Sequence, residues 1–324
     1  MQVQSTTGGA RQLSARAIVF DEPQALSLRQ LDLTAPQRGQ VVVDVEWTGI
    51  STGTEKLLWD GRMPMFPGMG YPLVPGYETV GRIADRGEAT AFNVGDRVFV
   101  SGARCFGEIR GLFGGAASRL VVDETKVMPI GDALDAEAIL LALAATAQHA
   151  LHAGRSEAPP DLIVGHGVLG RLLARLTVMT GGAPTVWETE ERRMSGADGY
   201  AVVPPDADER RDYRRVIDAS GDTGIIDTLV QHLDRRGEIV LAGFYPERLS
   251  FDFPAAFMRE ATISVAAEWN DGDLQSVRNF VAAGRLSLDK LISHRLPASE
   301  AQKAYPTAFA DPDCLKMVLD WRSN

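Results

Sequence analysis

Cysteine is almost absent from this sequence, and that absence limits what the protein can be. The chain has 324 residues and two cysteines, Cys105 and Cys314, which do not form a CxxC motif. Neither a disulfide framework nor a thiolate cage for a metal is therefore supported, and a reducing cytoplasm is the expected location. No apolar run approaches the ~20 residues that span a bilayer. Residues 1–14 lack the apolar core of a secretory signal and are predicted to form a flexible extension.

Positive charge is also scarce relative to negative charge. The sequence has 33 Lys and Arg against 43 Asp and Glu, which gives a formal net charge of −10. Nucleic acid is therefore not expected as a partner, because phosphate binding requires a basic stripe and none is visible. With 45% hydrophobic residues, the chain is long enough to form two domains with separate cores.

The first part of the chain reads as a small β domain. Short β-rich runs are separated by Gly and Pro turns, which is typical of a mostly antiparallel unit such as a partial barrel. These runs are residues 15–20, 40–47, 79–84, 97–100 and 118–122. We therefore predict a first domain, a partial β-barrel, at residues 15–130.

The pattern changes after residue 131. Residues 136–153 form a long Ala/Leu-rich stretch with helical periodicity. Strands and helices then alternate, which predicts a parallel, doubly wound sheet at residues 131–288. These elements are expected at 161–164, 169–180, 185–188, 213–218, 225–233 and 237–242. A helix at 299–309 and a strand at 314–321 predict that residues 289–324 return to the first domain.

A glycine-rich motif follows the first predicted strand of this alternating region. Gly165, Gly167 and Gly170 form G-x-G-x-x-G between that strand and the next helix. In such a motif the first glycine permits the tight turn, the second lets a pyrophosphate approach the backbone, and the third lets helix and strand pack closely. The phosphates then lie at the helix N-terminus, where amide donors favour negative charge. We predict a dinucleotide site here.

An acidic residue at the end of the next strand sets the expected cofactor preference. Glu188 follows the motif by close to the usual separation of about 20 residues. A carboxylate there accepts hydrogen bonds from the ribose and repels a 2′-phosphate, so NAD is favoured over NADP. Arg192 and Arg193 lie nearby, and cations at this place keep NADP as an alternative cofactor. The other interpretation is that both arginines lie on a solvent-exposed helix face. His166 occupies a variable position of the motif.

These segments resemble the medium-chain dehydrogenase/reductase superfamily along nearly the whole chain. Residues 41–50 resemble its first strand, residues 71–81 its P-L-x-P-G-H-E-x-x-G signature, and residues 93–98 its K-x-G-D-R-V signature. Residues 138–151 resemble the helix that leads into the cofactor domain. The resemblance implies an α/β fold with a GroES-like partial β-barrel catalytic domain and a Rossmann domain. The expected cofactor contacts beyond the glycines and Glu188 are Thr146, Val168 and Leu169.

This sequence differs from the superfamily pattern at the positions that bind zinc. Zinc-dependent members hold catalytic zinc with Cys, His and Cys from three of these segments. Here the corresponding positions are Ser51 (or Thr52), Tyr77, and Ala142 or a neighbour. Hydroxyls, a phenol and a methyl group cannot supply the tetrahedral nitrogen and sulfur ligands that zinc prefers. The lobe of four closely spaced cysteines is missing as well, so no zinc is expected.

Within the superfamily, four segments resemble the dehydrogenases of the bacteriochlorophyll pathway. They are residues 49–63, 66–72, 101–107 and 111–116. The resemblance implies NAD-dependent oxidation of a ring-attached hydroxyethyl group to an acetyl group, with a tetrapyrrole as the substrate. It also implies a role in bacteriochlorophyll biosynthesis.

A segment rich in aromatic residues and methionine is the candidate substrate loop. Residues 57–71 interleave large apolar side chains with Gly and Pro, which exclude a regular helix or a central strand. Such side chains suit a flat ligand. They equally suit a cap over the first domain's core or a subunit contact. A glycine-rich stretch at 102–115 either forms the opposite lip or is a plain connection. The candidate contacts are Trp59, Met63, Phe66, Met69, Tyr71 and Phe106.

Without zinc, polar side chains must accept the proton and stabilise the developing alkoxide. By family analogy Tyr77 and Glu78 lie near the nicotinamide, and Thr54, Glu55 and Lys56 follow the first ligand position. A phenol can donate to the alkoxide, and a lysine can lower the pKa of a neighbouring group. The alternatives are that Tyr77 is a packed replacement for a ligand and that Glu55 and Lys56 form a surface pair.

Further expectations concern two residues, two alternative functions and the assembly. His149 is interpreted as a core histidine on the Ala-rich helix, with a general base as the alternative, and Cys105 as an inert thiol, with a substrate-lip residue as the alternative. Two other functions stay open: a zinc-free quinone or enone reductase that uses NADPH, and a protein that binds dinucleotide without turnover. The strand near residues 261–267 could pair across a two-fold axis and form a homodimer.

Overall fold

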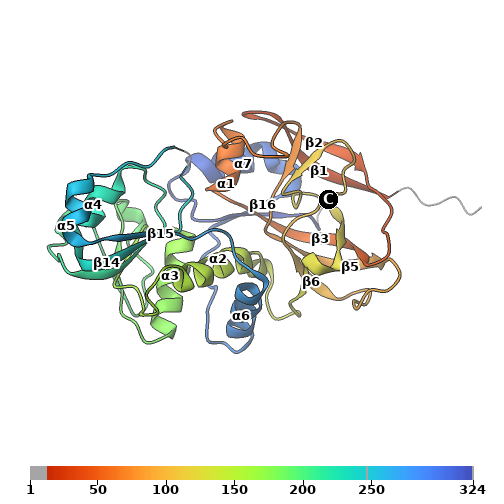
Figure 1. Cartoon of the computed structure of the whole chain (residues 1–324). Helices are drawn as coiled ribbons and strands as arrows, with labels where there is room; N and C mark the ends of the chain where they lie inside the picture. Colours follow the sequence, from red (N-terminus) through yellow and green to blue (C-terminus); the bar gives the residue numbers. More distant parts are fainter. Residues whose placement is uncertain (1–12, 246, 323–324) are drawn as a thin grey trace, which may run out of the picture.

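The computed structural model describes residues 13–245 and 247–322 and has two lobes (Figure 1). The expected extension at residues 1–14 lies almost wholly outside the described residues. The predicted fold class is confirmed, because a mixed β lobe and a lobe with a parallel sheet and helices are both present. None of the helices within the described ranges is both long and apolar enough to cross a bilayer.

The first lobe contains two sheets whose strands are nearly all antiparallel. One has the strand order β2-β1-β4-β7 and the other β16-β17-β3-β5-β6-β9, with β8 paired to β3. Their inward-facing side chains form one apolar core. The elements are β1 (Ser14–Glu22), β2 (Ala25–Asp32), β3 (Gln40–Ile50), α1 (Thr54–Trp59), β4 (Leu73–Pro75), β5 (Thr79–Arg86), β6 (Arg97–Val100), β7 (Arg110–Leu112), β8 (Arg119–Asp123) and β9 (Val127–Pro129).

The second lobe is a six-stranded parallel sheet with the order β12-β11-β10-β13-β14-β15. Its elements are α2 (Leu141–His152), β10 (Leu162–Val164), α3 (Val168–Met179), β11 (Thr185–Trp187), β12 (Ala201–Val203), β13 (Tyr213–Asp218), α4 (Ile225–His232), β14 (Leu233–Leu241), α5 (Phe253–Arg259), β15 (Thr262–Val265) and α6 (Asp271–Ala282). Two predicted boundaries were wrong: residues 136–140 form a 3-10 turn ahead of α2, and β14 begins at Leu233 because that residue pairs with Tyr213.

Both faces of the parallel sheet are covered, as its sequence pattern predicts. Ile163 faces a core built with α2, α3 and α6, whereas its neighbours Leu162 and Val164 face a core built with α4 and α5. Successive strand residues point to opposite faces, so a strand that is apolar at every position is buried on both sides. Figure 1 shows α4 and α5 grouped at one end of this lobe, and α2 and α6 between the lobes.

The last elements of the chain return to the first lobe. They are β16 (His294–Pro297), α7 (Ala301–Ala310) and β17 (Met317–Asp320). Strand β17 pairs antiparallel with the end of β3, where Met317 lies opposite Ile50 and Asp320 opposite Trp47. The division at residues 130 and 288 stays a prediction.

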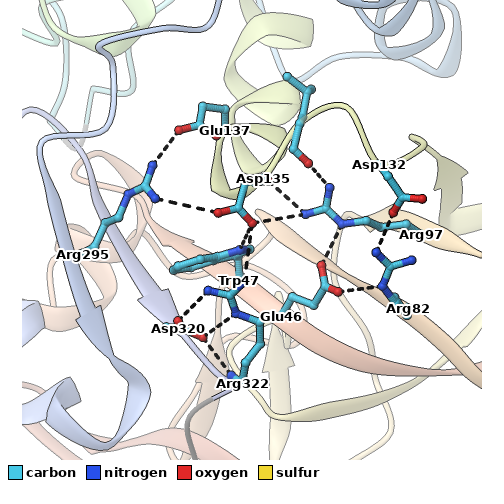
Figure 2. A network of polar contacts seen from close by, with 11 residues as sticks. Glu46, Trp47, Arg82, Arg97, Asp132, Asp135, Glu137, Arg295, Asp320 and Arg322 are labelled. Carbon is cyan, nitrogen blue, oxygen red and sulfur yellow. Dashed lines mark hydrogen bonds and ion pairs between the residues drawn. The ribbon is translucent and has the colours of Figure 1, made fainter. Parts of the chain in front are cut away.

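A polar network fixes the chain where it crosses from the first lobe to the second (Figure 2). Asp135, just before α2, accepts a hydrogen bond of 2.9 Å from the Trp47 indole. Its carboxylate also lies 3.6 Å from Arg322 and 3.9 Å from Arg295. Arg97 donates to the carbonyl oxygens of residues 134 and 135. Strands from both ends of the sequence therefore position the crossing.

Candidate active site

The glycine motif forms the turn between β10 and α3. Gly165 has φ +93, which only glycine adopts without strain. A Cβ on Gly170 would lie 1.8 Å from the Gly165 carbonyl oxygen, so the third glycine is required for helix and strand to pack. A Cβ on Gly167 would meet nothing within 4 Å. The packing of the protein therefore does not require glycine there, and the space above this backbone is open.

Glu188 follows β11 and faces this turn. Its Oε2 accepts from the His166 amide at 2.9 Å, and its Oε1 accepts from the amides of Thr189 and Glu190 at 2.8 and 2.9 Å. These bonds hold the carboxylate at the end of the strand. Oε2 keeps acceptor capacity for a further donor.

His166 supports the turn from the protein side. Its imidazole is fully buried and contacts the Arg193 carbonyl oxygen at 2.6 Å and the Tyr200 hydroxyl at 2.8 Å. Burial is the largest of the effects that lower its pKa to about 4, so the ring is neutral. Arg192 forms an exposed pair with Asp313 at 3.2 Å, while Arg193 lines the cleft beside Glu188.

A cleft with a volume of about 1640 Å³ runs between the lobes. Its volume exceeds that of ordinary small-ligand pockets, roughly 300–1,000 Å³. The second-lobe wall includes the predicted cofactor contacts Gly165, Gly167, Val168, Leu169, Gly170 and Glu188, together with Thr146 from α2. The first-lobe wall includes Ser51, Thr54 and Tyr77.

A hydroxyl pair lies at two of the positions that the sequence analysis compares with the metal ligands of zinc-dependent members. Ser51 Oγ and the Tyr77 hydroxyl are 2.8 Å apart. The Tyr77 ring packs edge-on against Phe113 at 5.7 Å between centroids and lies 6.0 Å from Trp269. Burial, and then the charge of Glu78, raise the pKa of Tyr77, so this phenol is neutral and can donate.

Two carboxylates are buried behind the pair and do not line the cleft. Glu55 accepts from the Ser51 amide at 3.1 Å and from the Tyr305 hydroxyl at 3.0 Å. Burial, followed by the charge of Glu78, raises the pKa of Glu55 to about 8. Glu78 is fully buried and pairs with Lys316 at 2.5 Å. Burial raises the pKa of Glu78 as well, and Lys316 opposes that shift.

This donor set does not suit zinc. Nitrogen and thiolate ligands are needed in a tetrahedral arrangement, and the position offers the oxygens of Ser51 and Tyr77. Within residues 13–245 and 247–322 no group of three or more His, Cys, Asp or Glu is arranged to hold a metal ion.

Lys56 does not reach the cleft, contrary to expectation. It is an i,i+4 partner of Asp60 on α1, at 2.9 Å, and lies 5.7 Å from the centroid of the Phe309 ring. The proposed surface pair of Glu55 and Lys56 is also wrong, because Glu55 is only 1% exposed. Helix periodicity explains the result, since neighbours on a helix point in different directions.

The candidate substrate loop divides into two sets. Met63 and Phe66 line the cleft. Trp59, Met69, Tyr71 and Phe106 do not; they pack in or against the core of the first lobe. Trp59, for example, stacks on Tyr305 at 6.4 Å. The exclusion of a helix was wrong at the start of this segment, because α1 extends to Trp59 before the first glycine.

Two residues interpreted as inert lie outside the cleft lining. His149 pairs with Asp273 at 2.8 Å. Cys105 is buried, which raises the pKa of its thiol to about 11. A buried neutral thiol is a poor nucleophile.

Several site residues were missed by the sequence analysis. Lys316 and Tyr305 come from the returning C-terminal segment, and Trp269 follows β15. A lysine inside the apolar run 314–319 was a usable signal, because a buried lysine requires a partner. Trp269 follows the carboxyl end of a parallel strand, the edge where ligands bind in such folds.

Comparison with known proteins agrees with this geometry. Residues 37–132 match the alcohol dehydrogenase GroES-like domain. The chain is 55% identical to the 2-desacetyl-2-hydroxyethyl bacteriochlorophyllide A dehydrogenases of Cereibacter sphaeroides, over 95% of this chain and 98% of the relative, and of Rhodobacter capsulatus, over 96% and 99%.

Solved structures share the whole architecture. A short chain alcohol dehydrogenase from E. coli CFT073 complexed with NADH has a TM-score of 0.81 at 22% identity, over 95% of this chain and 99% of that chain. A putative zinc-binding dehydrogenase from Sinorhizobium meliloti bound to NADP has a TM-score of 0.79 at 21% identity, over 95% and 100%. At these identities the likeness shows the fold.

Together, the two-lobed fold, the glycine turn and the near full-length relatives show one ancestry. The chain belongs to the medium-chain dehydrogenase/reductase superfamily of alcohol oxidoreductases, and within it to the family of the bacteriochlorophyllide dehydrogenases.

Proposed function

We propose that this protein oxidises the hydroxyethyl side chain of a bacteriochlorophyllide to an acetyl group, with NAD⁺ as the hydride acceptor and without zinc. The observation that carries the proposal is one continuous cleft. It joins the glycine turn at Gly167 to the Ser51–Tyr77 hydroxyl pair and continues past Met63 and Phe66. The 55% identity to two proteins with this activity in their names supports the choice of substrate.

In the proposed reaction the alcohol carbon loses a hydride and its oxygen loses a proton, which yields the ketone, NADH and H⁺. The bound nicotinamide supplies the hydride acceptor. The neutral Tyr77 phenol donates to the substrate oxygen, a role that hydroxyl donors fill when no metal is available. The Ser51 hydroxyl, 2.8 Å from the Tyr77 hydroxyl, contacts the same substrate oxygen. Glu55 lies behind Ser51 and, with a pKa of about 8, is a neutral carboxyl at neutral pH. It takes up the released proton only when it is ionised, so this role strengthens as the pH rises towards and above 8.

NAD is proposed over NADP because of Glu188. Its carboxylate is held by three backbone amides at the end of β11. A fixed negative charge there repels a 2′-phosphate and accepts from ribose hydroxyls. Arg192 is engaged with Asp313, which leaves Arg193 as the nearby guanidinium in the cleft.

A homodimer through the edge of the parallel sheet is also proposed. Strand β15 is the last strand in the sheet order. Val265 on this strand is 76% exposed, and Phe257 and Met258 on the adjoining α5 are 65% and 73% exposed. An exposed apolar strand edge of this kind favours pairing with a second chain.

The test is direct oxidation of the pigment. Purified protein is mixed with the hydroxyethyl bacteriochlorophyllide and either NAD⁺ or NADP⁺, and the long-wavelength absorption band is followed. We expect a red shift with NAD⁺, because the new carbonyl joins the conjugated ring, and little with NADP⁺. Zinc content is measured on the same sample and should be far below one per chain. An unmoved band with folded protein would remove the proposal, and turnover that depends on stoichiometric zinc would remove its metal-free mechanism.

A further inference from the structure

The cleft is lined by four cations that differ in what they contact. They are Arg104, Lys126, Arg193 and Lys316. Lys316 is 2% exposed and is committed to Glu78 at 2.5 Å. Arg193 lies beside Glu188 and Glu190, at the part of the cleft that follows β11. Arg104 and Lys126 are the exposed cations of the first-lobe wall.

Arg104 lies on the same wall as the hydroxyl pair. The preceding residue, Ala103, donates its amide to the Phe113 carbonyl oxygen at 2.9 Å. The Phe113 ring in turn packs against Tyr77 at 5.7 Å. Phe113 therefore contacts both Tyr77 and the segment that carries Arg104.

The backbone that carries Arg104 is tightly packed. A Cβ on Gly102 would lie 2.2 Å from the Phe113 carbonyl oxygen, and Cβ atoms on Gly111 and Gly114 would lie 2.3 and 1.9 Å from that of Ala103. Only glycine permits the two segments to approach so closely. The glycine-rich stretch at 102–115 is thus a packed lip of the cleft, and it presents Arg104 from a defined position.

The Arg104 guanidinium has no ion pair or hydrogen bond with any residue in the ranges 13–245 and 247–322. The apolar residues Met63, Phe66 and Phe113 line the same cleft. An arginine without a protein partner beside apolar walls suits a flat apolar ligand that carries a carboxylate, because the planar guanidinium binds carboxylates in a bidentate manner.

We propose that Arg104 binds the free carboxylate of the pigment and selects unesterified pigments over their esters. The inference rests on the proposed function. The ending "-ide" denotes a pigment whose propionic acid side chain is not esterified with a long-chain alcohol, so the substrate carries a negative charge that its ester lacks. Arg104 is exposed, which leaves room for a side chain at the rim of the cleft.

The test compares the free acid and the methyl ester of the hydroxyethyl pigment in the wild type, Arg104→Gln and Lys126→Gln. Both KM and kcat are measured, and pigment affinity is measured separately by absorption titration in the presence of NADH. We expect the wild type to prefer the acid by about tenfold in KM, the effect of one charge-assisted contact. Arg104→Gln should raise KM for the acid to that of the ester, with kcat for the ester unchanged.

Lys126→Gln should keep the preference for the acid. The inference is overturned if the acid-to-ester ratio in Arg104→Gln equals that of the wild type, or if Lys126→Gln abolishes it instead. An enzyme that oxidises neither pigment would contradict the proposed function itself, and the two failures are thereby distinguished.

Discussion

The two walls of the cleft follow their family to different degrees. On the second-lobe wall, Gly165 and Gly170 have steric roles within the protein, and Gly167 faces open space. On the substrate wall, Ser51 and Tyr77 form a hydroxyl pair 2.8 Å apart, at positions where the sequence resemblance predicts metal ligands in zinc-dependent members. In the proposed function, the glycine turn receives the dinucleotide and the hydroxyl pair acts on the alcohol. Three predictions can break or sharpen this contrast.

The largest effect is expected on the substrate wall. Tyr77→Phe removes the phenol hydroxyl and keeps the ring packed against Phe113. If this hydroxyl stabilises the developing alkoxide, kcat for pigment oxidation should fall about 10²–10³-fold, with dinucleotide affinity unchanged. Tyr213→Phe, which removes a buried hydroxyl bonded to Asp208, is the control and should retain kcat. Retention of kcat within a few-fold in Tyr77→Phe would mean that Tyr77 only fills space.

On the second-lobe wall, substitution of two glycines is expected to affect different properties: stability at one and NAD⁺ affinity at the other. Gly170→Ala places a methyl group 1.8 Å from a backbone oxygen, which should cost about 1–3 kcal/mol of stability and lower Tm by several degrees. Gly167→Ala should leave Tm unchanged and weaken NAD⁺ about tenfold, or roughly 1.4 kcal/mol. Thermal denaturation and calorimetry measure the two quantities. If Gly167→Ala bound NAD⁺ as tightly as the wild type, the pyrophosphate would not lie at this turn.

The smallest effect concerns Glu55 and pH. Its pKa is raised from 4.5 to about 8, chiefly by burial. The folded protein therefore binds a proton that the unfolded chain releases, and this contribution to stability is complete below pH 4.5 and is lost as pH rises through about 8. Glu55→Gln should flatten the fall in Tm between pH 6 and pH 9, whereas the exposed control Glu209→Gln should not. Parallel pH profiles in both variants would show that Glu55 is already ionised at neutral pH.

Much of the fold could be predicted because its signals are local. The glycine motif at 165–170 and the alternation of strands and helices follow from spacing alone, and the structure confirms the fold class. The short strands β4, β7 and β9 have three residues each, too few for a pattern.

The site was harder to predict because its contacts join distant parts of the chain. Glu55 meets Tyr305, 250 positions along the chain, through a hydrogen bond that no local pattern shows. In the candidate substrate loop, Gly and Pro interrupt the periodicity, so the sequence could not tell which large side chains face the core. Trp59 and Met69 turned inward, whereas Met63 and Phe66 line the cleft.

The pairing of β17 with β3 has a consequence for biosynthesis. The residues that cover positions 47–50 of β3 are synthesised long after β3 itself. Until β17 has been made, the nascent first lobe presents an unpaired backbone edge, which is a template for aggregation. A chain interrupted before β17 would therefore keep this edge of its earliest sheet open.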